Sequence, residues 1–391
     1  MKPLLEKIPF KIVHMDGLGQ GVSKILDKTA FISKTLPNEE GLARPTGHRK
    51  QVYFAQLDSP QDLQNSSPMR IPAECPHFDQ CPGCHYLHTS YPMELQFKQD
   101  ALNRELRKLK IETPAPILHP SEQRSAYRNR ITLHYNKTQD RLGIFSATTN
   151  EIIPIPHCRL PILEIQHLVT GLYQNQAWQK LAGKQEGHLE IYKHPVSGLH
   201  TTADAPNALV GFSQVHQSMN DELTEWIKTR ASELHFQEKN LIVDLFGGDG
   251  NLTKKINFCD SILVVDKYRN NELPTSNSAP QQFYSCDLYN AHESNKLRHN
   301  LAKKILTHPL ELMIIDPPRS GFTLTATLAK EWKPTNIFYV SCAPDTLMRD
   351  IKDLLPLYSI RDVHLFDMFP GTFHFETVIH LISRPDLSAR K

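Results

Sequence analysis

The chain has 391 residues, a formal net charge of +2 and hydrophobic residues at 39% of its positions. A single core rarely organises so long a chain, so we expect about two or three domains. The longest apolar runs, residues 241–246 and 312–315, are far shorter than the roughly 20 residues of a membrane-spanning helix, which excludes a helical membrane protein.

The N-terminal residues predict a cytoplasmic protein that begins with a β-rich domain. The opening MKPLLEKIPFKIVHMDG has charges within its apolar stretch and no small-residue cleavage site, unlike a signal peptide. Apolar and polar positions then alternate around the glycine-rich turn MDGLGQG, as they do in a small antiparallel barrel. We therefore predict a barrel domain over residues 1–62.

A linker and a helix follow this region. Residues 60–74 are rich in Pro, Ser and Gln, which is typical of a linker. Residues 93–110 have helical periodicity and stop before the prolines of TPAP. Strand-like alternation follows in YRNRITLHY and RLGIFSATTNEIIPIPHC. We predict a central domain over residues 63–204, whose helix packs on the C-terminal domain.

Lysine and arginine are concentrated in one segment. A net charge of +2 and a pI near 8.1 are less basic than is typical of a nucleic-acid-binding domain. Residues 101–130 nevertheless hold seven Lys or Arg against three Glu, a local excess of four. This excess fits either an RNA contact or a solvated helix face and loop, and charge alone leaves both interpretations open.

Four of the seven cysteines form a set with metal-ligand spacing. Cys75, Cys81 and Cys84 follow the pattern C-x5-C-x2-C, and Cys158 provides a distant fourth thiol. A cytosolic location argues against disulfides, and four thiolates suit zinc or a 4Fe-4S cluster. Three close cysteines with one distant partner favour the iron-sulfur cluster. Three histidines are alternative ligands: His77, His85 and His88.

From about residue 205 strands alternate with helices, which predicts a parallel sheet covered on both faces. In LIVDLFGGDGNLTKKI a strand leads into a glycine-rich turn and a helix, so the backbone can approach a ligand closely. The spacing is not the G-x-G-x-x-G of dinucleotide-binding proteins. Asp266 ends the next strand and is well placed to accept hydrogen bonds from a ribose diol. Asp287 is placed to contact the edge of an adenine ring. Either aspartate alone also fits a loop carboxylate or a helix cap.

Three C-terminal segments contain candidate catalytic residues: IIDPPRSG, FYVSCAPDTLMRD and FDMFPGTFHFET. Asp316 follows a strand in a loop stiffened by two prolines. Cys342 is a suitable nucleophile for addition to carbon 6 of uracil, which would make carbon 5 reactive. We expect the helix that follows Cys342 to lower the pKa of this thiol. Glu376, beside aromatic residues, suits the base that removes the carbon 5 proton. The alternatives are a buried small side chain for Cys342 and a surface strand carboxylate for Glu376.

These segments resemble the RNA uracil-C5-methyltransferase family, and the four-cysteine set resembles its iron-sulfur branch, which methylates large-subunit ribosomal RNA. The resemblance covers essentially the whole chain. It implies an α/β fold with a Rossmann-like class I methyltransferase domain over residues 205–391, an N-terminal OB-like (TRAM-like) β-barrel and a central iron-sulfur α+β domain. It also implies S-adenosylmethionine and a 4Fe-4S cluster as cofactors, 23S rRNA as partner and 5-methyluridine as product. We expect a monomer that binds neither DNA nor a membrane.

The resemblance further implies roles for individual residues. Cys342 is the nucleophile, Glu376 the base, and Arg319 supports the active-site loop. Six residues bind S-adenosylmethionine: Gln214, Phe246, Asn251, Asp266, Asp287 and Asp316. Four residues bind the cluster: Cys75, Cys81, Cys84 and Cys158. The chain departs from the family where Gly247 replaces a common cysteine and Asp266 a common glutamate.

Three other functions are compatible with parts of this pattern. Methylation of the transfer RNA T loop would use identical chemistry, although the cysteines and the barrel favour ribosomal RNA. A non-catalytic RNA-binding ribosome-assembly factor would not need Cys342 or Glu376. A radical enzyme would keep an open iron on three cysteines, whereas Cys158 offers a fourth ligand here.

Overall fold

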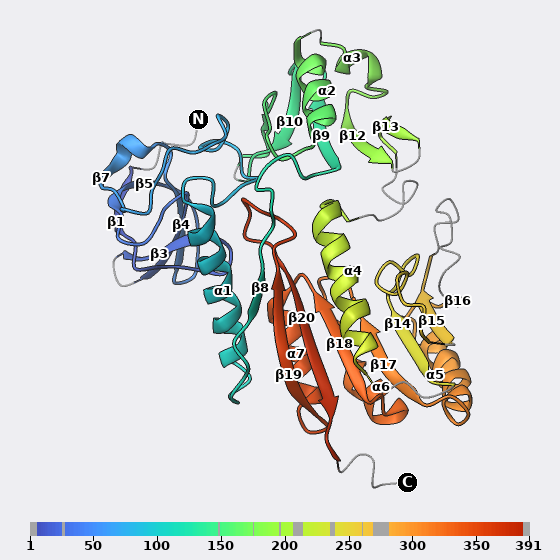
Figure 1. The fold of residues 1–391 in the computed structure, drawn as a ribbon. Coiled ribbons are helices and arrows are strands. Elements are labelled where there is room, and N and C mark those ends of the chain that lie inside the picture. The colour runs from blue at the N-terminus through green and yellow to red at the C-terminus, as the bar shows by residue number, and fades with distance from the viewer. Residues whose placement is uncertain are drawn as a thin grey trace. The chain divides into compact units, whose positions relative to one another are not determined.

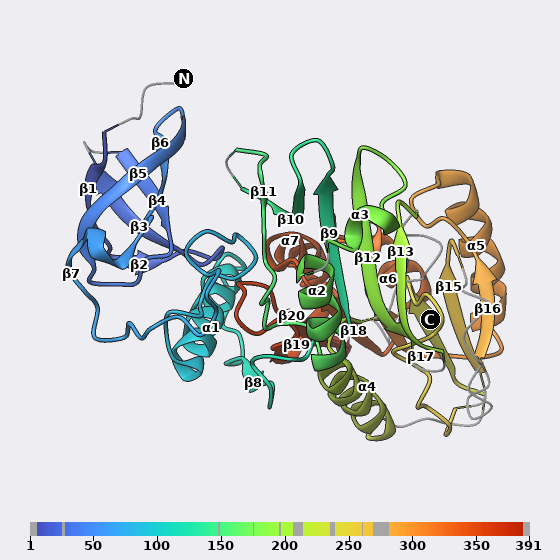
Figure 2. The ribbon, with the colours of Figure 1, turned by 90° about the horizontal axis from the view of Figure 1, so that it is seen from above.

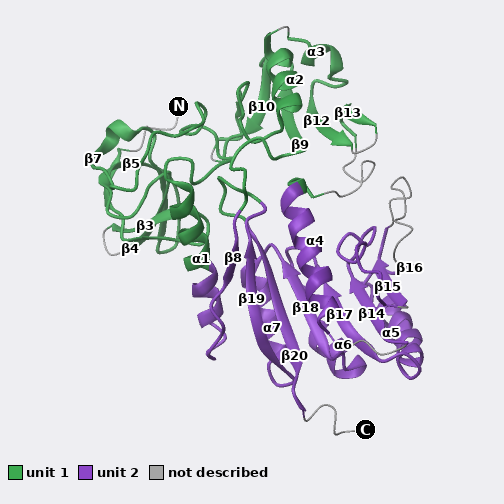
Figure 3. Ribbon diagram, in the orientation of Figure 1, with its two compact units in different colours: residues 1–101, 121–217, 369–374 green, residues 102–120, 218–368, 375–391 purple. Residues whose placement is uncertain are grey.

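Over the residues that it describes, the computed structural model of the chain contains three β-sheets and their connecting helices (Figures 1 and 2). It divides into two compact units (Figure 3). Unit 1 comprises Met1–Ala101, Ser121–Gln217 and Phe369–His374, and unit 2 comprises Leu102–Pro120, Ser218–Met368 and Phe375–Lys391. The structure describes residues 6–25, 28–147, 149–174, 176–194, 197–205, 214–234, 239–259, 261–268 and 281–385.

The N-terminal sheet of unit 1 has seven strands, in the order β1-β5-β6-β4-β3-β2 with β7 beside β5. Its elements are β1 Ile8–Lys11, β2 His14–Met15, β3 Gln20–Ile25, β4 Lys28–Ser33, β5 Glu40–Arg49, β6 Val52–Gln56, the short helix η1 Pro60–Asp62 and β7 Leu63–Asn65. Alternate residues such as Phe10 and Ile32 form its core. The pairings are antiparallel, as predicted, except that β4 and β6 run parallel, because alternation does not report strand direction.

The second sheet of unit 1 is antiparallel and has the order β11-β10-β9-β12-β13. Its strands are β9 Arg130–Asn136, β10 Arg141–Phe145, β11 Ile152–Ile153, β12 Glu186–His194 and β13 Gly198–Ala203. The helices α2 (Leu163–Gln174) and α3 (Trp178–Leu181) share a core with this sheet. Ile165 and Val169 of α2 pack there with Leu133 and Ile191 of the strands, so one sheet face is covered by a helix.

Helix α1 (Tyr91–Arg107) begins in unit 1, and its last residues belong to unit 2. It corresponds to the helix predicted over residues 93–110. The observed helix ends earlier, since Lys110 has a left-handed φ of 57°, which helical residues do not adopt. Its packing on the C-terminal domain stays a prediction.

The sheet of unit 2 has the order β16-β15-β14-β17-β18-β20-β19-β8. Its strands are β8 Ile117–His119, β14 Leu241–Leu245, β15 Ser261–Asp266, β16 Gln281–Ser285, β17 Leu310–Ile315, β18 Asn336–Ser341, β19 Tyr358–Phe366 and β20 Glu376–Ser383, and its helices are α4 Gln217–Ser232, α5 Ala291–Ile305, α6 Thr325–Trp332 and α7 Pro344–Leu354. Strands β14 to β18 are parallel, and β20 runs antiparallel to β18 and β19. Helix α4 covers one face, and α6 and α7 the other (Figures 1 and 2). The predicted α/β fold of this region is confirmed.

The parallel strands β14 and β18 are buried along their length because helices cover both faces of the sheet. All five residues of β14 and all six of β18 are buried. Polar side chains therefore appear where these strands end, at the edge that carries the glycine-rich turn. Within the described ranges, no helix has the length and apolar character needed to cross a bilayer.

Candidate active site

The glycine-rich turn of unit 2 follows the buried strand β14. Phe246 and Gly248 have left-handed φ angles of 61° and 53°. Gly248 N donates a hydrogen bond to Oδ2 of Asp266 at 3.0 Å, which holds the turn against the end of β15. A Cβ atom on Gly247 would lie 2.7 Å from Cγ of the buried Asp244, closer than real Cβ atoms approach. This position therefore requires glycine here, where the family commonly has cysteine.

Three of the predicted cofactor residues lie at the ends of neighbouring parallel strands. Asp266 ends β15, Asp287 comes soon after β16, and Asp316 follows β17. Burial, together with the Asp266 carboxylate, raises the pKa of Asp316 to about 7. Lys267 lies 2.9 Å from Oδ2 of Asp287 and lowers the pKa of that carboxyl. The strand ends thus form an edge with acceptor oxygens for a polar ligand.

The remaining two polar residues of the predicted cofactor set lie in different units. Asn251 is held against α4, where its Nδ2 donates to Oδ1 of Asn220 at 2.8 Å and Nδ2 of Asn220 donates back at 3.2 Å. Gln214 belongs to unit 1, and its backbone carbonyl accepts a hydrogen bond from Nδ2 of Asn129 at 3.0 Å. Asn251 therefore has a fixed side chain beside the glycine-rich turn.

The sheet of unit 2 brings the two predicted catalytic residues to the same end of one strand pair. Strands β18 and β20 are antiparallel, with Ser341 opposite Thr377. Cys342 follows Ser341 and Glu376 precedes Thr377, so the next pair of positions holds the thiol and the carboxylate. Asp316 follows β17, the strand on the other side of β18. A thiol, a carboxylate and the proline-containing loop therefore meet at one edge.

Burial dominates the electrostatics of this edge. Glu376 is 7% exposed, its Oε2 has no hydrogen-bond partner, and burial followed by the Asp316 charge raises its pKa well above the ordinary value. The interpretation of Glu376 as a surface carboxylate is wrong. Burial also raises the pKa of Cys342 to about 11, with Glu376 adding to the shift and Arg319 opposing it. The predicted lowering of this thiol pKa is wrong, because desolvation outweighs the amides of α7.

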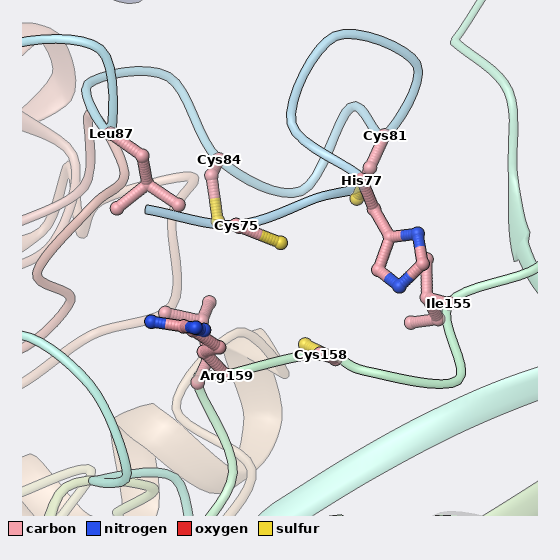
Figure 4. Close-up of a pocket in the computed structure, with 9 residues that line it drawn as sticks. Cys75, His77, Cys81, Cys84, Leu87, Ile155, Cys158 and Arg159 are labelled. Atoms are coloured by element: carbon pink, nitrogen blue, oxygen red, sulfur yellow. The ribbon is translucent and has the colours of Figure 1, made fainter. Parts of the chain in front are cut away.

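The four predicted cluster ligands line one pocket of unit 1 (Figure 4). All four are free cysteines, and the pocket also contains apolar side chains such as Leu87. Figure 4 shows Cys75 and Cys84 on one segment and Cys158 on the facing one. Burial raises the pKa of the Cys158 thiol to about 11, and the Arg128 guanidinium opposes this shift. The fold therefore gathers thiols that are far apart in sequence.

The side chains around the four thiols help to identify the kind of group that this pocket would bind. Across the described ranges, no three His, Cys, Asp or Glu side chains are grouped closely enough to hold one metal ion. Nζ of the buried Lys34 donates to the carbonyls of Cys81 and Cys84 at 3.0 and 2.5 Å. Of the alternative ligands, His77 lines the pocket, whereas the buried His88 ring stacks on Phe78. The site thus has a cation beside its thiols.

Comparisons with known proteins agree with this geometry. The sequence profile of the family described as tRNA (Uracil-5-)-methyltransferase matches residues 285–384, a stretch that includes Cys342 and Glu376. The 23S rRNA (uracil(1939)-C(5))-methyltransferases RlmD of Shewanella sediminis and Haemophilus influenzae are 25% and 26% identical, each over 96% of both chains. These matches support the predicted RNA uracil-C5-methyltransferase family.

A solved structure has the same fold as this chain. The structure of Pyrococcus abyssi tRNA (uracil-54, C5)-methyltransferase in complex with S-adenosyl-L-homocysteine covers 96% of this chain and 100% of its own, with a TM-score of 0.67 and 20% identity. The uracil-C5-methyltransferase fold therefore extends along nearly all of this chain.

The sequence patterns did not indicate two aromatic residues of this chain, Tyr289 and Phe322, that lie beside Phe246. The Phe246 ring lies 4.9 Å from that of Phe322 and 5.5 Å from that of Tyr289. The Tyr289 hydroxyl donates to Gly321 O at 2.7 Å, which ties the segment after β16 to the loop after β17. Only the arrangement of the segments after β14, β16 and β17 in one sheet reveals the cluster, although an aromatic residue two positions after Asp287 was a weak signal.

Proposed function

We propose that this protein transfers the methyl group of S-adenosylmethionine to carbon 5 of a uridine in 23S rRNA and produces 5-methyluridine. The observation that carries the proposal is the pairing of β18 with β20, which brings Cys342 and Glu376 to the same strand end. The RlmD relatives support the substrate, since their similarity extends over 96% of both chains.

The proposed chemistry begins with a covalent bond between the enzyme and the RNA. The Cys342 thiolate adds to carbon 6 of uracil, and the electron pair of the ring double bond moves to form an enolate, so carbon 5 becomes nucleophilic. S-adenosylmethionine supplies an electrophilic methyl group when bound. Glu376 then removes the carbon 5 proton, the ring double bond re-forms, and the thiolate leaves. Burial raises the pKa of Glu376, and a carboxylate with a raised pKa is a stronger base for this proton transfer.

Six residues are proposed to hold the methyl donor: Gln214, Phe246, Asn251, Asp266, Asp287 and Asp316. Asp266 and Asp287 follow two adjacent strands, which suits a ribose diol and an adenine edge. The backbone of the glycine-rich turn can approach the ligand closely because Gly247 and Gly248 carry no side chain. We also propose a division of the chain into three domains, 1–62, 63–204 and 205–391, of which the first is a TRAM-like OB barrel, and a cytoplasmic monomer.

We propose that Cys75, Cys81, Cys84 and Cys158 hold a 4Fe-4S cluster. The donor set supports this, since four free thiols line one pocket and the buried Lys34 ammonium is placed to offset negative charge. Three closely spaced cysteines with one distant partner in the sequence favour this cluster over a single zinc ion. The methyl transfer is redox-neutral, and the cluster would therefore support the fold.

Removal of Cys158 tests this cluster. Anaerobically purified wild-type protein should contain about four iron and four sulfide per chain, and Cys158→Ala should lose most of both, because three thiolates hold a cluster less firmly. Iron and sulfide assays with visible absorption measure the loss. Cys286→Ala, which removes a buried cysteine outside the pocket, should retain the metal. A wild-type protein that binds only zinc would contradict the cluster proposal.

The function itself is tested with RNA that traps the covalent step. Ribosomal RNA carrying 5-fluorouridine should form a labelled protein–RNA adduct with radiolabelled S-adenosylmethionine, because fluorine cannot leave as a proton does. Mapping the adduct on denaturing gels identifies the uridine. An adduct with transfer RNA alone would instead support T-loop methylation. Binding of both RNAs without an adduct would support an assembly factor.

A further inference from the structure

The segment Phe369–His374 is the only part of the β19–β20 connection assigned to unit 1 (Figure 3). It ends two residues before Glu376, the first residue of β20. In the β19–β20 ladder Glu376 forms the last pair, opposite Phe366. The sheet therefore restrains the chain after Glu376, while any restraint on the preceding side must come from this connection.

A buried ion pair on α1 holds the middle of the segment. Oε1 of Glu94 accepts hydrogen bonds from Gly371 N at 2.7 Å and from Lys98 Nζ at 2.7 Å, and both charged side chains are 0% exposed. Lys98 Nζ also donates to Phe369 O at 3.3 Å. Arg124 donates to the other oxygen of Glu94 at 2.9 and 3.1 Å. One carboxylate thus binds two cations and a loop amide.

Further contacts within unit 1 hold Pro370 and Gly371 of the segment. The backbone amides of His85 and Tyr86, which follow the cysteine motif, both donate to Gly371 O, at 2.7 and 3.2 Å. The Tyr127 hydroxyl donates to Pro370 O at 3.0 Å. Gly371 itself has a left-handed φ of 80°. Burying two charged side chains and most of a third to orient one loop is costly unless the loop must be placed accurately.

We propose that Glu94, together with Lys98, is a positioning residue for the elimination step, because it fixes the segment that leads into Glu376. This inference rests on the proposed function. Among the described residues, Oε2 of Glu376 has no hydrogen-bond partner, so no hydrogen bond to this oxygen fixes the carboxylate. Only four residues, Thr372 to Phe375, separate Gly371 from Glu376. Because so short a stretch of chain has little slack, a displacement of Phe369–His374 would also move Glu376. A shift of about 1 Å in a catalytic group can slow a reaction about 100-fold.

The test separates methyl transfer from proton removal in the full-length protein. The substrate is 23S rRNA with tritium at carbon 5 of its uridines, and the methyl group of S-adenosylmethionine carries carbon-14. In Glu94→Gln tritium release should slow about 100-fold, whereas methyl transfer in the first turnover should change less than tenfold. A methylated protein–RNA adduct should consequently accumulate on denaturing gels.

Two further variants keep the test decisive. Glu94→Gln leaves the Lys98 charge buried without its carboxylate and can destabilise the fold, so the double variant Glu94→Gln with Lys98→Met removes both charges. Glu105→Gln is the matched control, since Glu105 lies on the same helix but pairs with Lys108 at the surface, and it should behave like wild type. Thermal melting and S-adenosylmethionine binding verify folding.

The outcomes distinguish the two proposals. Equal slowing of methyl transfer and tritium release in the folded double variant, or no slowing of either, would overturn the positioning role while leaving the enzyme's function intact. Wild-type protein that transfers no methyl group to 23S rRNA would overturn the proposed function as well. Selective slowing of tritium release with adduct accumulation supports the positioning role.

Discussion

Cys342→Ala is expected to reduce methyl transfer to 23S rRNA by at least about 10⁴-fold, because carbon 5 of uracil is not reactive until a nucleophile adds to carbon 6. The variant should also form no covalent complex with 5-fluorouridine RNA. Incorporation of labelled methyl groups and denaturing gels measure both effects. Because Cys342 is partly exposed at the end of β18, its removal should leave the fold intact.

The matched control for this variant is Cys259→Ala. Cys259 is also a free cysteine of unit 2, but it is buried and its thiol contacts the Asn240 carbonyl at 3.2 Å. Its removal should leave the methylation rate close to that of wild type. Residual activity of Cys342→Ala within tenfold of wild type would exclude covalent catalysis by this residue.

Glu376→Gln is expected to stop the reaction at a later stage. Glutamine has the shape of glutamate but does not accept the carbon 5 proton, so turnover should fall by about 10² to 10⁴-fold. The methylated protein–RNA adduct should accumulate, in contrast to Cys342→Ala, which forms none. Quantifying the adduct on denaturing gels after reaction with natural RNA separates these two outcomes.

Glu311→Gln is a suitable comparison for this change. Glu311 belongs to β17 of the same sheet, and its Oε1 accepts a hydrogen bond from Asn336 that glutamine can still accept. It should neither slow turnover nor trap RNA. If Glu376→Gln lost activity without any adduct, the residue would act before methyl transfer, and its assignment as the final base would be wrong.

Local sequence patterns were sufficient to predict much of the fold of the C-terminal domain. Strand β14 and the glycine-rich turn are adjacent in sequence, and a buried apolar run followed by glycines has the same meaning wherever it occurs. The order of strands and helices after residue 205 follows from the same periodicities. The helix predicted at residues 93–110 was displaced by a few residues, since a left-handed Lys110 ends it early.

The electrostatics of the site could not be predicted in the same way. The sequence placed a helix after Cys342 and predicted a lower thiol pKa, whereas burial beside Glu376 raises it to about 11. Glu376 was open to interpretation as a surface residue, and only the packed sheet shows it 7% exposed. Desolvation depends on every element around a group, which no local pattern reports.

The sequence by itself determined the residue types that the chemistry needs: a cysteine and a glutamate in their motifs, aspartates after strands, and four cysteines with ligand spacing. Tertiary structure alone decided which of these meet. Cys342 and Glu376 come together because β18 and β20 pair, and Cys158 joins Cys75 and its neighbours because the fold of unit 1 returns the chain to them. Glu94 likewise reaches Gly371 across most of the sequence. Motifs are local, whereas pairing and burial depend on contacts between distant segments.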